Sequence, residues 1–119
     1  MAFQTLSAQT FTGIDIWPGT GNSTPYSYTS FAGKVYFTAQ ADTLHGSELW
    51  LTDGTQAGTT FVKDINPGPG SSYPFGCTVL GNKMFFRADD GVHGAELWVT
   101  DGTTAGTMMV ADIASQKFK

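Results

Sequence analysis

Residues 48–59 read ELWLTDGTQAGT, and residues 96–107 read ELWVTDGTTAGT, 48 positions further along the chain. The likeness extends beyond this motif. Over the wider segments 45–65 and 93–113, 15 of 21 aligned positions are identical. Such a high internal identity at this spacing indicates a structural repeat of about 48 residues, in which each copy packs against its neighbour.

Each copy divides into four short segments with the composition of β-strands, bounded by turn signals such as Ala32-Gly33, Gly81-Asn82 and the DGT of the motif. Pro- and Gly-rich loops precede each set, because neither residue type continues a strand. A segment at 12–16 repeats the fourth strand and predicts an extra edge strand that pairs across the boundary between two copies and locks a ring. We expect eight further strands, at residues 26–31, 34–39, 48–52, 59–65, 75–80, 83–88, 96–100 and 107–113.

The strands carry apolar residues on both faces. Leu49 and Leu51 point to one side of the third strand, and Trp50 points to the other. A sheet that is apolar on both faces needs a neighbouring sheet on each side, as a propeller blade has. The sequence therefore predicts an all-β fold of two four-stranded antiparallel β-propeller-type blades that complete a ring by oligomerisation. The expected divisions are an arm at 1–11, the edge strand and first blade at 12–65, the second blade at 66–113 and a tail at 114–119.

Composition and charge exclude several classes of protein. The 119 residues include 15 Gly and only 13% charged residues, which is typical of a turn-rich β protein. The net charge of −4, with scattered Lys and Arg, argues against nucleic acid as a partner. No run approaches the roughly 18 apolar residues of a membrane helix, so we expect no membrane partner. The start lacks a signal peptide, which predicts a cytosolic chain or a mature exported one.

The single cysteine, Cys77, leaves no internal disulfide to stabilise the fold. Because neither histidine lies near it in sequence, we expect a small buried apolar side chain and not a nucleophile.

The repeat resembles the ELWxxDGT repeat family, a propeller-like repeat of bacterial proteins, many of them exported. The AGT element at 57–59 and the KDINPG element at 63–68 also match, while the second copy departs from the pattern after Ile113. The resemblance covers residues 11–113 and implies a propeller-type fold and an extracellular or cell-surface location. It implies little about activity. The motif residues that carry it are 48–50 with 53–55, and 96–98 with 101–103.

Two blades do not close a ring, and stacked repeats normally need at least three units. The chain is therefore expected to assemble with itself or to be a piece of a longer array. Head-to-tail contacts usually close into rings, so a trimer of six blades or a tetramer of eight is favoured. The trimer resembles two-blade lectins of bacteria and fungi. A contact that does not close would instead build a filament.

Four side chains at equivalent positions are candidates for ligand binding. His45 and His93 precede the motif, where they either bind a metal or a sugar hydroxyl or hydrogen-bond a turn carbonyl. Glu48 and Glu96 either accept ligand hydroxyls or accept backbone N–H groups. As a glycosidase pair they would need different environments, which equivalent repeat positions do not provide. One His and one Glu per blade are also too few for a closed zinc site.

Trp17, Trp50 and Trp98 are the candidates for stacking on sugar rings. The alternative for Trp50 and Trp98 is packing between blades. Trp17 has Asn66 as its counterpart, so the core does not require it, and we expect it to be the exposed anchor. Four tyrosines supply further aromatic surface: Tyr26, Tyr28, Tyr36 and Tyr73.

The aspartates are expected to serve mainly in turns. Asp53 and Asp101 begin the DGT turns and should bond N–H groups two residues on. Asp89 and Asp90 faintly resemble a calcium loop, without its full spacing. The sequence therefore predicts no cofactor and leaves calcium at these two residues as the one open case.

The chain has no Gly-rich phosphate loop, nucleophile elbow or His and Cys cluster. We therefore predict a non-enzymatic, self-assembling β-propeller-type binding protein, with carbohydrate as the ligand by analogy with two-blade lectins. One alternative is a structural surface or fibre protein built from the repeats. A glycosidase-like enzyme is the least supported alternative.

Overall fold

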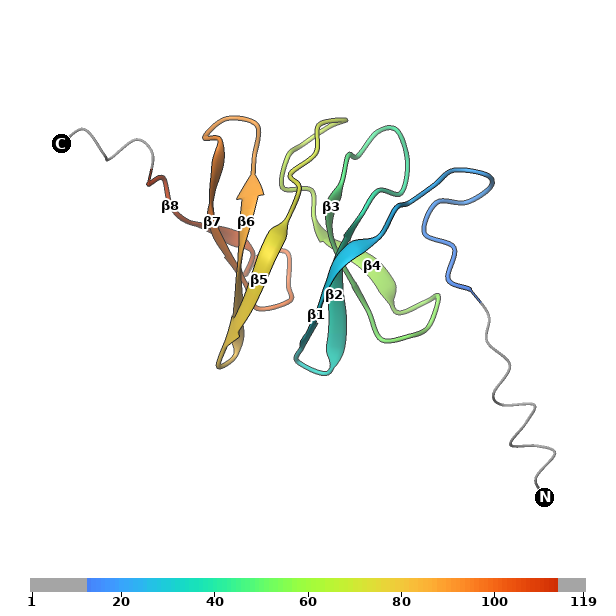
Figure 1. The fold of residues 1–119 in the computed structure, drawn as a ribbon, viewed down its shortest axis with the longest axis horizontal. Coiled ribbons are helices and arrows are strands. Elements are labelled where there is room, and N and C mark those ends of the chain that lie inside the picture. The colour runs from blue at the N-terminus through green and yellow to red at the C-terminus, as the bar shows by residue number, and fades with distance from the viewer. Residues whose placement is uncertain (1–12, 114–119) are drawn as a thin grey trace, which may run out of the picture.

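The computed structural model describes residues 13–113 and contains two four-stranded antiparallel sheets, in which each strand pairs with the next along the chain (Figure 1). The first sheet holds β1 (Tyr26–Phe31), β2 (Lys34–Ala39), β3 (Glu48–Thr52) and β4 (Thr59–Lys63). The second sheet holds β5 (Phe75–Leu80), β6 (Lys83–Asp89), β7 (Ala95–Thr100) and β8 (Met108–Ala111). The predicted all-β class and the two four-stranded units are confirmed. The arm and the tail lie outside the described residues.

The repeated ELW motif forms the third strand of each sheet, with a partner strand on both sides. Trp50 lies opposite Phe37 of β2 and Phe61 of β4. The first hairpin turns through Ala32 (φ 52°) and Gly33 (φ 76°), the two positive angles that a tight two-residue turn requires. The most conspicuous string in the sequence is therefore an interior strand of the scaffold.

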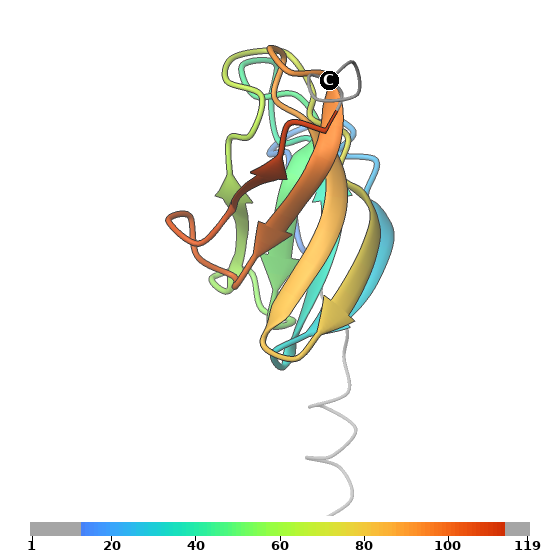
Figure 2. The ribbon, with the colours of Figure 1, turned by 90° about the vertical axis from the view of Figure 1, so that its left-hand side faces the viewer.

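The main core lies between the two sheets, which stack face to face. Figure 2 looks onto the second sheet, with the first sheet behind it. Leu49 and Leu51 face this core, whereas Trp50 lies on the opposite face of the first sheet, as the sequence predicted. The first sheet and the loop after it contribute five buried residues and the second sheet four: Phe31, Tyr36, Leu49, Val62 and Ile65, with Met84, Phe86, Ala88 and Trp98.

A smaller apolar cluster covers the outer face of the first sheet. Phe37, Ala39 and Trp50 are buried there, with Ile16 and Ala41 packed against them. Phe37, Ala39 and Trp50 are the repeat counterparts of three core residues of the second sheet, Phe86, Ala88 and Trp98. The outer face of the first sheet therefore carries the same residue types, at the same repeat positions, as the face of the second sheet that packs against the first.

Residues 13–16, the described part of the predicted edge strand, belong to no strand of the single chain, so the pairing of this segment with another copy stays a prediction. The segment instead bonds to a side chain of the DGT loop. The backbone N–H of Asp15 donates to Gln56 Oε1 at 2.8 Å, and Gln56 Nε2 donates to the Asp15 carbonyl at 3.0 Å. Thr104, at the position of Gln56 in the second copy, likewise donates to the carbonyl of Val62 at 2.7 Å.

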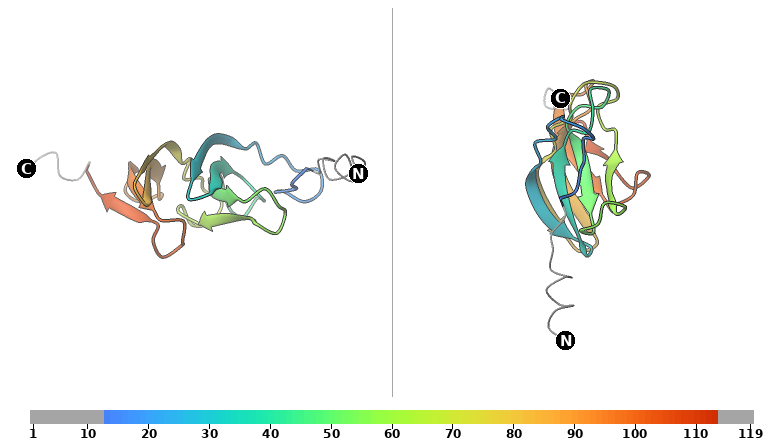
Figure 3. Two further views of the ribbon diagram at one scale, coloured as in Figure 1. Left: turned by 90° about the horizontal axis from the view of Figure 1, so that it is seen from below. Right: turned by 90° about the vertical axis from the view of Figure 1, so that its right-hand side faces the viewer.

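The fourth strands also end earlier than predicted, at Lys63 and Ala111. Beyond them the N–H groups of Ile65 and Ile113 donate to buried glutamates and not to a neighbouring strand. The described ends of the chain lie at opposite ends of the molecule (Figure 3). The two sheets do not close into a ring within one chain.

Candidate functional site

The two motif glutamates are buried and hold the backbone. Glu48, 1% exposed, accepts the N–H of Ile65 at 3.0 Å and the hydroxyl of Ser72 at 2.5 Å. Glu96, 6% exposed, accepts the N–H of Ile113 at 2.9 Å. Both carboxylates therefore tie the chain just beyond the fourth strand back to the third strand. This is the structural role that the sequence offered as the alternative to ligand binding.

Burial raises the pKa of Glu48 to about 7, although hydrogen bonds from Ser72 and from the backbone of Ile65 and Asn66 oppose the rise. The nearby Asp64 charge adds to it. Near neutral pH both protonation states of Glu48 are consequently populated, and the fold is sensitive to the charge at this one position.

The three tryptophans lie in different surroundings. Trp98 is 6% exposed in the main core, and Trp50 is 9% exposed in the outer cluster. Trp17 is half-buried, and its ring packs against Gly21 of its own loop so closely that a side chain at Gly21 would overlap it. Trp17 is thus the most accessible of the three, whereas Trp98 takes the packing role between the sheets.

A pocket of about 240 Å³ opens beside Trp50 on the outer face of the first sheet. It brings together three of the predicted site residues, His45, Glu48 and Trp50, and adds Asp42 and Phe61. The Phe61 ring lies 5.6 Å from the Trp50 ring and 5.7 Å from the His45 ring. Aromatic faces beside carboxylates are the surroundings in which sugar rings and their hydroxyls bind.

The two histidines serve turns, but their partners are carboxylates and not the expected carbonyls. His45 Nδ1 lies 3.0 Å from Asp42 Oδ1, and His93 Nδ1 lies 2.7 Å from Asp90 Oδ2. The hydrogen bond to the aspartate raises the pKa of each histidine. Each pair closes the loop between the second and third strands of its sheet.

The proposed calcium ligands are engaged by the protein itself. Asp89 Oδ1 accepts the N–H of Gly91 at 2.7 Å, and Asp90 Oδ1 accepts the N–H groups of Val92 and His93 at 2.9 and 2.8 Å. Burial would raise the pKa of Asp90, but these hydrogen bonds outweigh it and lower the pKa to about 2. Among residues 13–113 no group of three or more His, Cys, Asp or Glu side chains is arranged to hold a metal ion.

The DGT aspartates are turn residues, as predicted. Asp53 Oδ1 accepts the N–H and the hydroxyl of Thr55 at 2.9 and 2.6 Å, and Asp101 does the same for Thr103 at the same distances. Cys77 is half-buried against the core, and burial raises the pKa of its thiol. Both aspartates are therefore engaged within their own turns, and burial disfavours the thiolate form of Cys77.

Exposed aromatic side chains lie on or beside the first strands of the two sheets, β1 and β5, which lie side by side (Figure 1). Tyr28 is 63% exposed, Tyr73 56% and Phe75 59%. The Tyr28 ring lies 6.0 Å from the Phe37 ring, on the outer face of the first sheet. Tyr26 lies within electrostatic reach of Tyr73 and Arg87. Of the four tyrosines singled out in the sequence, only Tyr36 is buried in the core. The sequence analysis did not single out Phe75, although Phe75 occupies the position in the second copy that Tyr26 occupies in the first.

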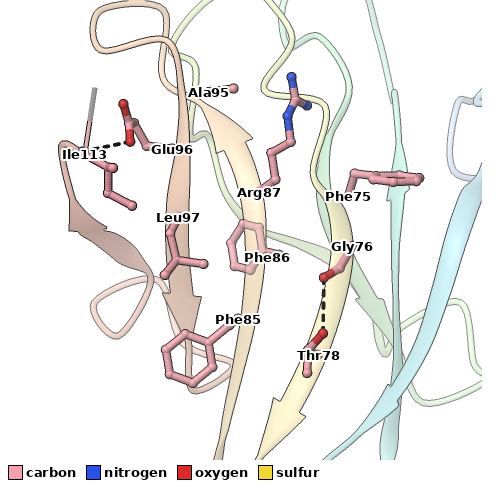
Figure 4. Close-up of a pocket in the computed structure, with 10 residues that line it drawn as sticks. All are labelled: Phe75, Gly76, Thr78, Phe85, Phe86, Arg87, Ala95, Glu96, Leu97 and Ile113. Carbon is pink, nitrogen blue, oxygen red and sulfur yellow. Dashed lines mark hydrogen bonds between the residues drawn. The ribbon is translucent and has the colours of Figure 1, made fainter. Parts of the chain in front are cut away.

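A larger pocket, of about 530 Å³, opens on the outer face of the second sheet. Figure 4 shows Glu96 and Arg87 at its upper end, with Leu97 and Phe85 lower down. Only Glu96 was predicted as a site residue. The signal for several of the others lies in the repeat, because Phe85, Arg87 and Leu97 stand where the first copy has the buried residues Tyr36, Thr38 and Leu49.

The chain matches no protein-family model, no curated protein and no solved structure. Its resemblance to the ELWxxDGT repeat therefore stays a prediction that rests on the motif residues. Within residues 13–113, no helix is long and apolar enough to cross a membrane.

Proposed function

We propose that this protein is a non-enzymatic, self-assembling protein of propeller-type blades, whose copies join head to tail and bind carbohydrate. The observation that carries self-assembly is an apolar face that no part of residues 13–113 covers. The second sheet exposes, on the side away from the first, the counterparts of residues that the first sheet buries. Four residues of the first copy are buried, at 0–5% exposure, whereas their counterparts in the second copy are 38–72% exposed. The pairs are Phe31 (5%) with Leu80 (72%), Leu49 (0%) with Leu97 (38%), Val62 (4%) with Val110 (47%), and Ile65 (3%) with Ile113 (55%).

The opposite end of the molecule offers the complementary face. Phe37, Ala39 and Trp50 are built like the residues with which the second sheet meets the first. The exposed second sheet of one copy therefore fits the outer first sheet of the next copy by the same contact that joins the sheets within a chain. Such a heterologous contact closes into a ring or runs on as a filament. We favour a ring of three or four copies, with six or eight blades.

The mass of the particle in solution, measured by size-exclusion chromatography with light scattering, tests self-assembly. We expect three or four times the mass of the chain. Leu97→Asp places a charge in the proposed contact and should yield folded monomers. Val92→Asp is the matched control, because Val92 is 80% exposed in a loop and should leave the assembly intact. A wild-type chain that stays monomeric at high concentration would overturn the proposal.

Carbohydrate as the ligand is supported by the exposed aromatic side chains on the first strands. Tyr26 and Tyr73, which lie within electrostatic reach of each other, offer exposed ring faces for stacking. The non-enzymatic character is supported by Glu48 and Glu96, each of which bonds a backbone N–H group just beyond the fourth strand of its own sheet. The two glutamates line separate pockets, whereas a hydrolytic pair must flank one bond of one substrate.

A glycan array followed by fluorescence titration tests the ligand class. We expect at least one glycan to bind, and Tyr26→Ala or Tyr73→Ala to weaken that binding about fivefold, since a stacked aromatic ring contributes on the order of 1 kcal/mol. Leu44→Ala, at a loop residue 68% exposed, is the control. An assembled protein that is silent across a broad panel would favour the structural surface or fibre protein instead.

A further inference from the structure

The loop that leads into the second sheet packs against the first sheet and hydrogen-bonds to Thr38, Ser47 and Glu48. We call the site formed by these three residues the seat. In this loop, residues 71–74 (SSYP), the N–H groups of Ser72 and Tyr73 both donate to the carbonyl of Ser47, at 3.0 and 3.3 Å. The Ser72 hydroxyl donates to Glu48 at 2.5 Å. Lower in the same seat, the hydroxyl of Thr38 donates to the carbonyl of Pro74 at 2.7 Å. The loop therefore satisfies polar groups of three different residues of the first sheet.

The contact is largely closed to solvent, although Tyr73 within the loop is 56% exposed. Ser72 and Pro74 are almost completely buried, and Thr38 is 0% exposed. Gly46 is pressed so tightly by the carbonyl of Gly70 that no side chain would fit at its position. The fit of this loop is therefore specific, with small residues and matched hydrogen bonds on both sides.

In the second sheet the corresponding seat is the large pocket of about 530 Å³ (Figure 4). Glu96 stands in the place of Glu48, Ala95 in the place of Ser47, and Arg87 in the place of Thr38. All three line the pocket. Gly94, the counterpart of the pressed Gly46, has no atom within 4 Å of where a side chain would begin. The seat is thus present in the second sheet, but no described residue fills it.

The counterpart of the seated loop is residues 22–25 (NSTP), which precede β1 at the other end of the molecule. Asn22, Thr24 and Pro25 are exposed. The loop nevertheless holds the backbone shape of the seated one, since Thr24 has φ 42° where Tyr73 has φ 48°. A positive φ is costly for a residue other than glycine, so the surrounding structure maintains it. The loop is therefore preorganised for a seat of the same kind, which lowers the entropic cost of docking.

We propose that the pocket at Glu96 and Arg87 receives residues 22–25 of a second copy of this chain. The hydroxyl of Ser23 donates to the Glu96 carboxylate, as Ser72 does to Glu48 within the chain. The N–H of Ser23 donates to the carbonyl of Ala95, and the N–H of Thr24 exchanges its partner in the single chain, Asn22 Oδ1 at 3.1 Å, for the same carbonyl. The Arg87 guanidinium replaces the Thr38 hydroxyl and donates to the carbonyl of Pro25. This inference rests on the proposed head-to-tail assembly and names the contact that gives it register and specificity.

Disulfide capture tests the contact, with Cys77→Ser as the background. Chains carrying Ser23→Cys are mixed with chains carrying Ala95→Cys under mild oxidation. We expect a cross-linked species of two chains from the mixture and little from either chain alone. Ser47→Cys with Ser72→Cys in one chain is the positive control, because these residues already meet within the molecule. A mixture that cross-links no better than Thr20→Cys with Ala95→Cys would overturn the inference.

A charge substitution separates this inference from the proposed function. Ser23→Asp sets a second carboxylate against Glu96 and should raise the dissociation constant of the assembly at least tenfold, whereas Thr20→Asp, in the exposed part of the same loop, should not. If Leu97→Asp dissociates the assembly and Ser23→Asp does not, self-assembly stands and the loop contact is wrong. The free peptide GSSYPF reproduces residues 70–75, the loop that fills the seat within the chain. If the wild-type chain is monomeric and its pocket at Glu96 binds this peptide, a second copy of the chain is not the occupant.

Discussion

Lys63 donates a hydrogen bond from Nζ to the carbonyl oxygen of Thr107 at 2.9 Å, across the boundary between the two sheets. The same ammonium lies 6.0 Å from the centroid of the Trp98 ring. The last strand of the first sheet therefore holds the second sheet by polar contacts as well as by the apolar core. At the exposed end of the molecule the counterpart of Lys63 is Ala111, which cannot make either contact.

Lys63→Met should lower the free energy of unfolding by about 1–2 kcal/mol, because it removes one partly buried charged hydrogen bond and one cation–π contact while keeping an apolar stem. Urea denaturation of a non-assembling variant such as Leu97→Asp measures the loss. Lys34→Met, on the exposed first residue of β2, is the control and should change stability little. Equal losses in the two variants would show that the contact between the sheets contributes nothing.

Ala111→Lys should tighten the association between copies. The substitution gives the second sheet an ammonium at the position where Lys63 of the first sheet contacts Thr107 and Trp98. A gain of about 1 kcal/mol in the free energy of association corresponds to a dissociation constant five- to tenfold lower. Sedimentation at a series of concentrations measures it, with Ala111→Met as the uncharged control. An unchanged dissociation constant would mean that copies do not meet by the contact seen between the sheets.

Leu49→Ala and Leu97→Ala should separate folding from assembly. Leu49 is 0% exposed between the sheets, so its truncation should cost about 2–5 kcal/mol of unfolding free energy. Leu97, its repeat counterpart, is 38% exposed in the single chain and should cost under about 1 kcal/mol there. Leu97→Ala should instead weaken association. Thermal melts at low and high protein concentration distinguish the two effects, and equal losses at low concentration would contradict the expectation.

The charge of Glu48 should make stability depend on pH. Its pKa is about 7 in the folded protein, above the ordinary 4.5, so the folded state binds the proton more tightly than the unfolded state. Stability should therefore fall as pH rises from about 4.5 to 7, by up to about 3 kcal/mol, and level off above that. Denaturation across this range, compared with Glu48→Gln, measures it. A wild-type profile that coincides with that of the variant would contradict the assignment.

Gly106→Ala should destabilise the second DGT turn, because the added methyl group would meet the carboxylate of Asp101. Crowding of this kind costs about 1–3 kcal/mol. Gly13→Ala is the control, since nothing lies within 4 Å of that position. Calorimetry on both variants checks the difference. A Gly106→Ala variant as stable as the wild type would show that the aspartate moves aside without cost.

Much of the scaffold follows from local patterns. The Ala32-Gly33 turn, the strands and the two-faced third strand of Leu49 and Trp50 were all predicted, because turn chemistry and side-chain alternation act over a few residues. The edge strand at 12–16 was predicted from likeness to the fourth strand. It fails in the single chain because the Gln56 side chain, and not a neighbouring strand, supplies hydrogen-bond partners to Asp15.

The candidate site was less accessible to sequence reasoning. Glu48 and Trp98 were named as ligand residues because of their type, yet burial assigns them to the backbone and the core. Arg87 and Phe75 were missed, because nothing in their own types or spacing separates a pocket residue from a strand residue. The repeat alignment gives their counterparts in the first copy, and the positions of the two sheets show that the second sheet has a pocket where the first sheet is covered.

By itself the sequence determined the repeat, its four-stranded unit and the apolar character of both faces, since each depends on contacts within about one turn or one strand pair. Tertiary structure alone decided which faces are covered. Two copies of nearly one motif have different surroundings because the first has a neighbouring sheet on the side where no described residue covers the second. Leu49 is therefore buried and Leu97 exposed, and residues 71–74 fill a site whose counterpart beside Glu96 no described residue fills.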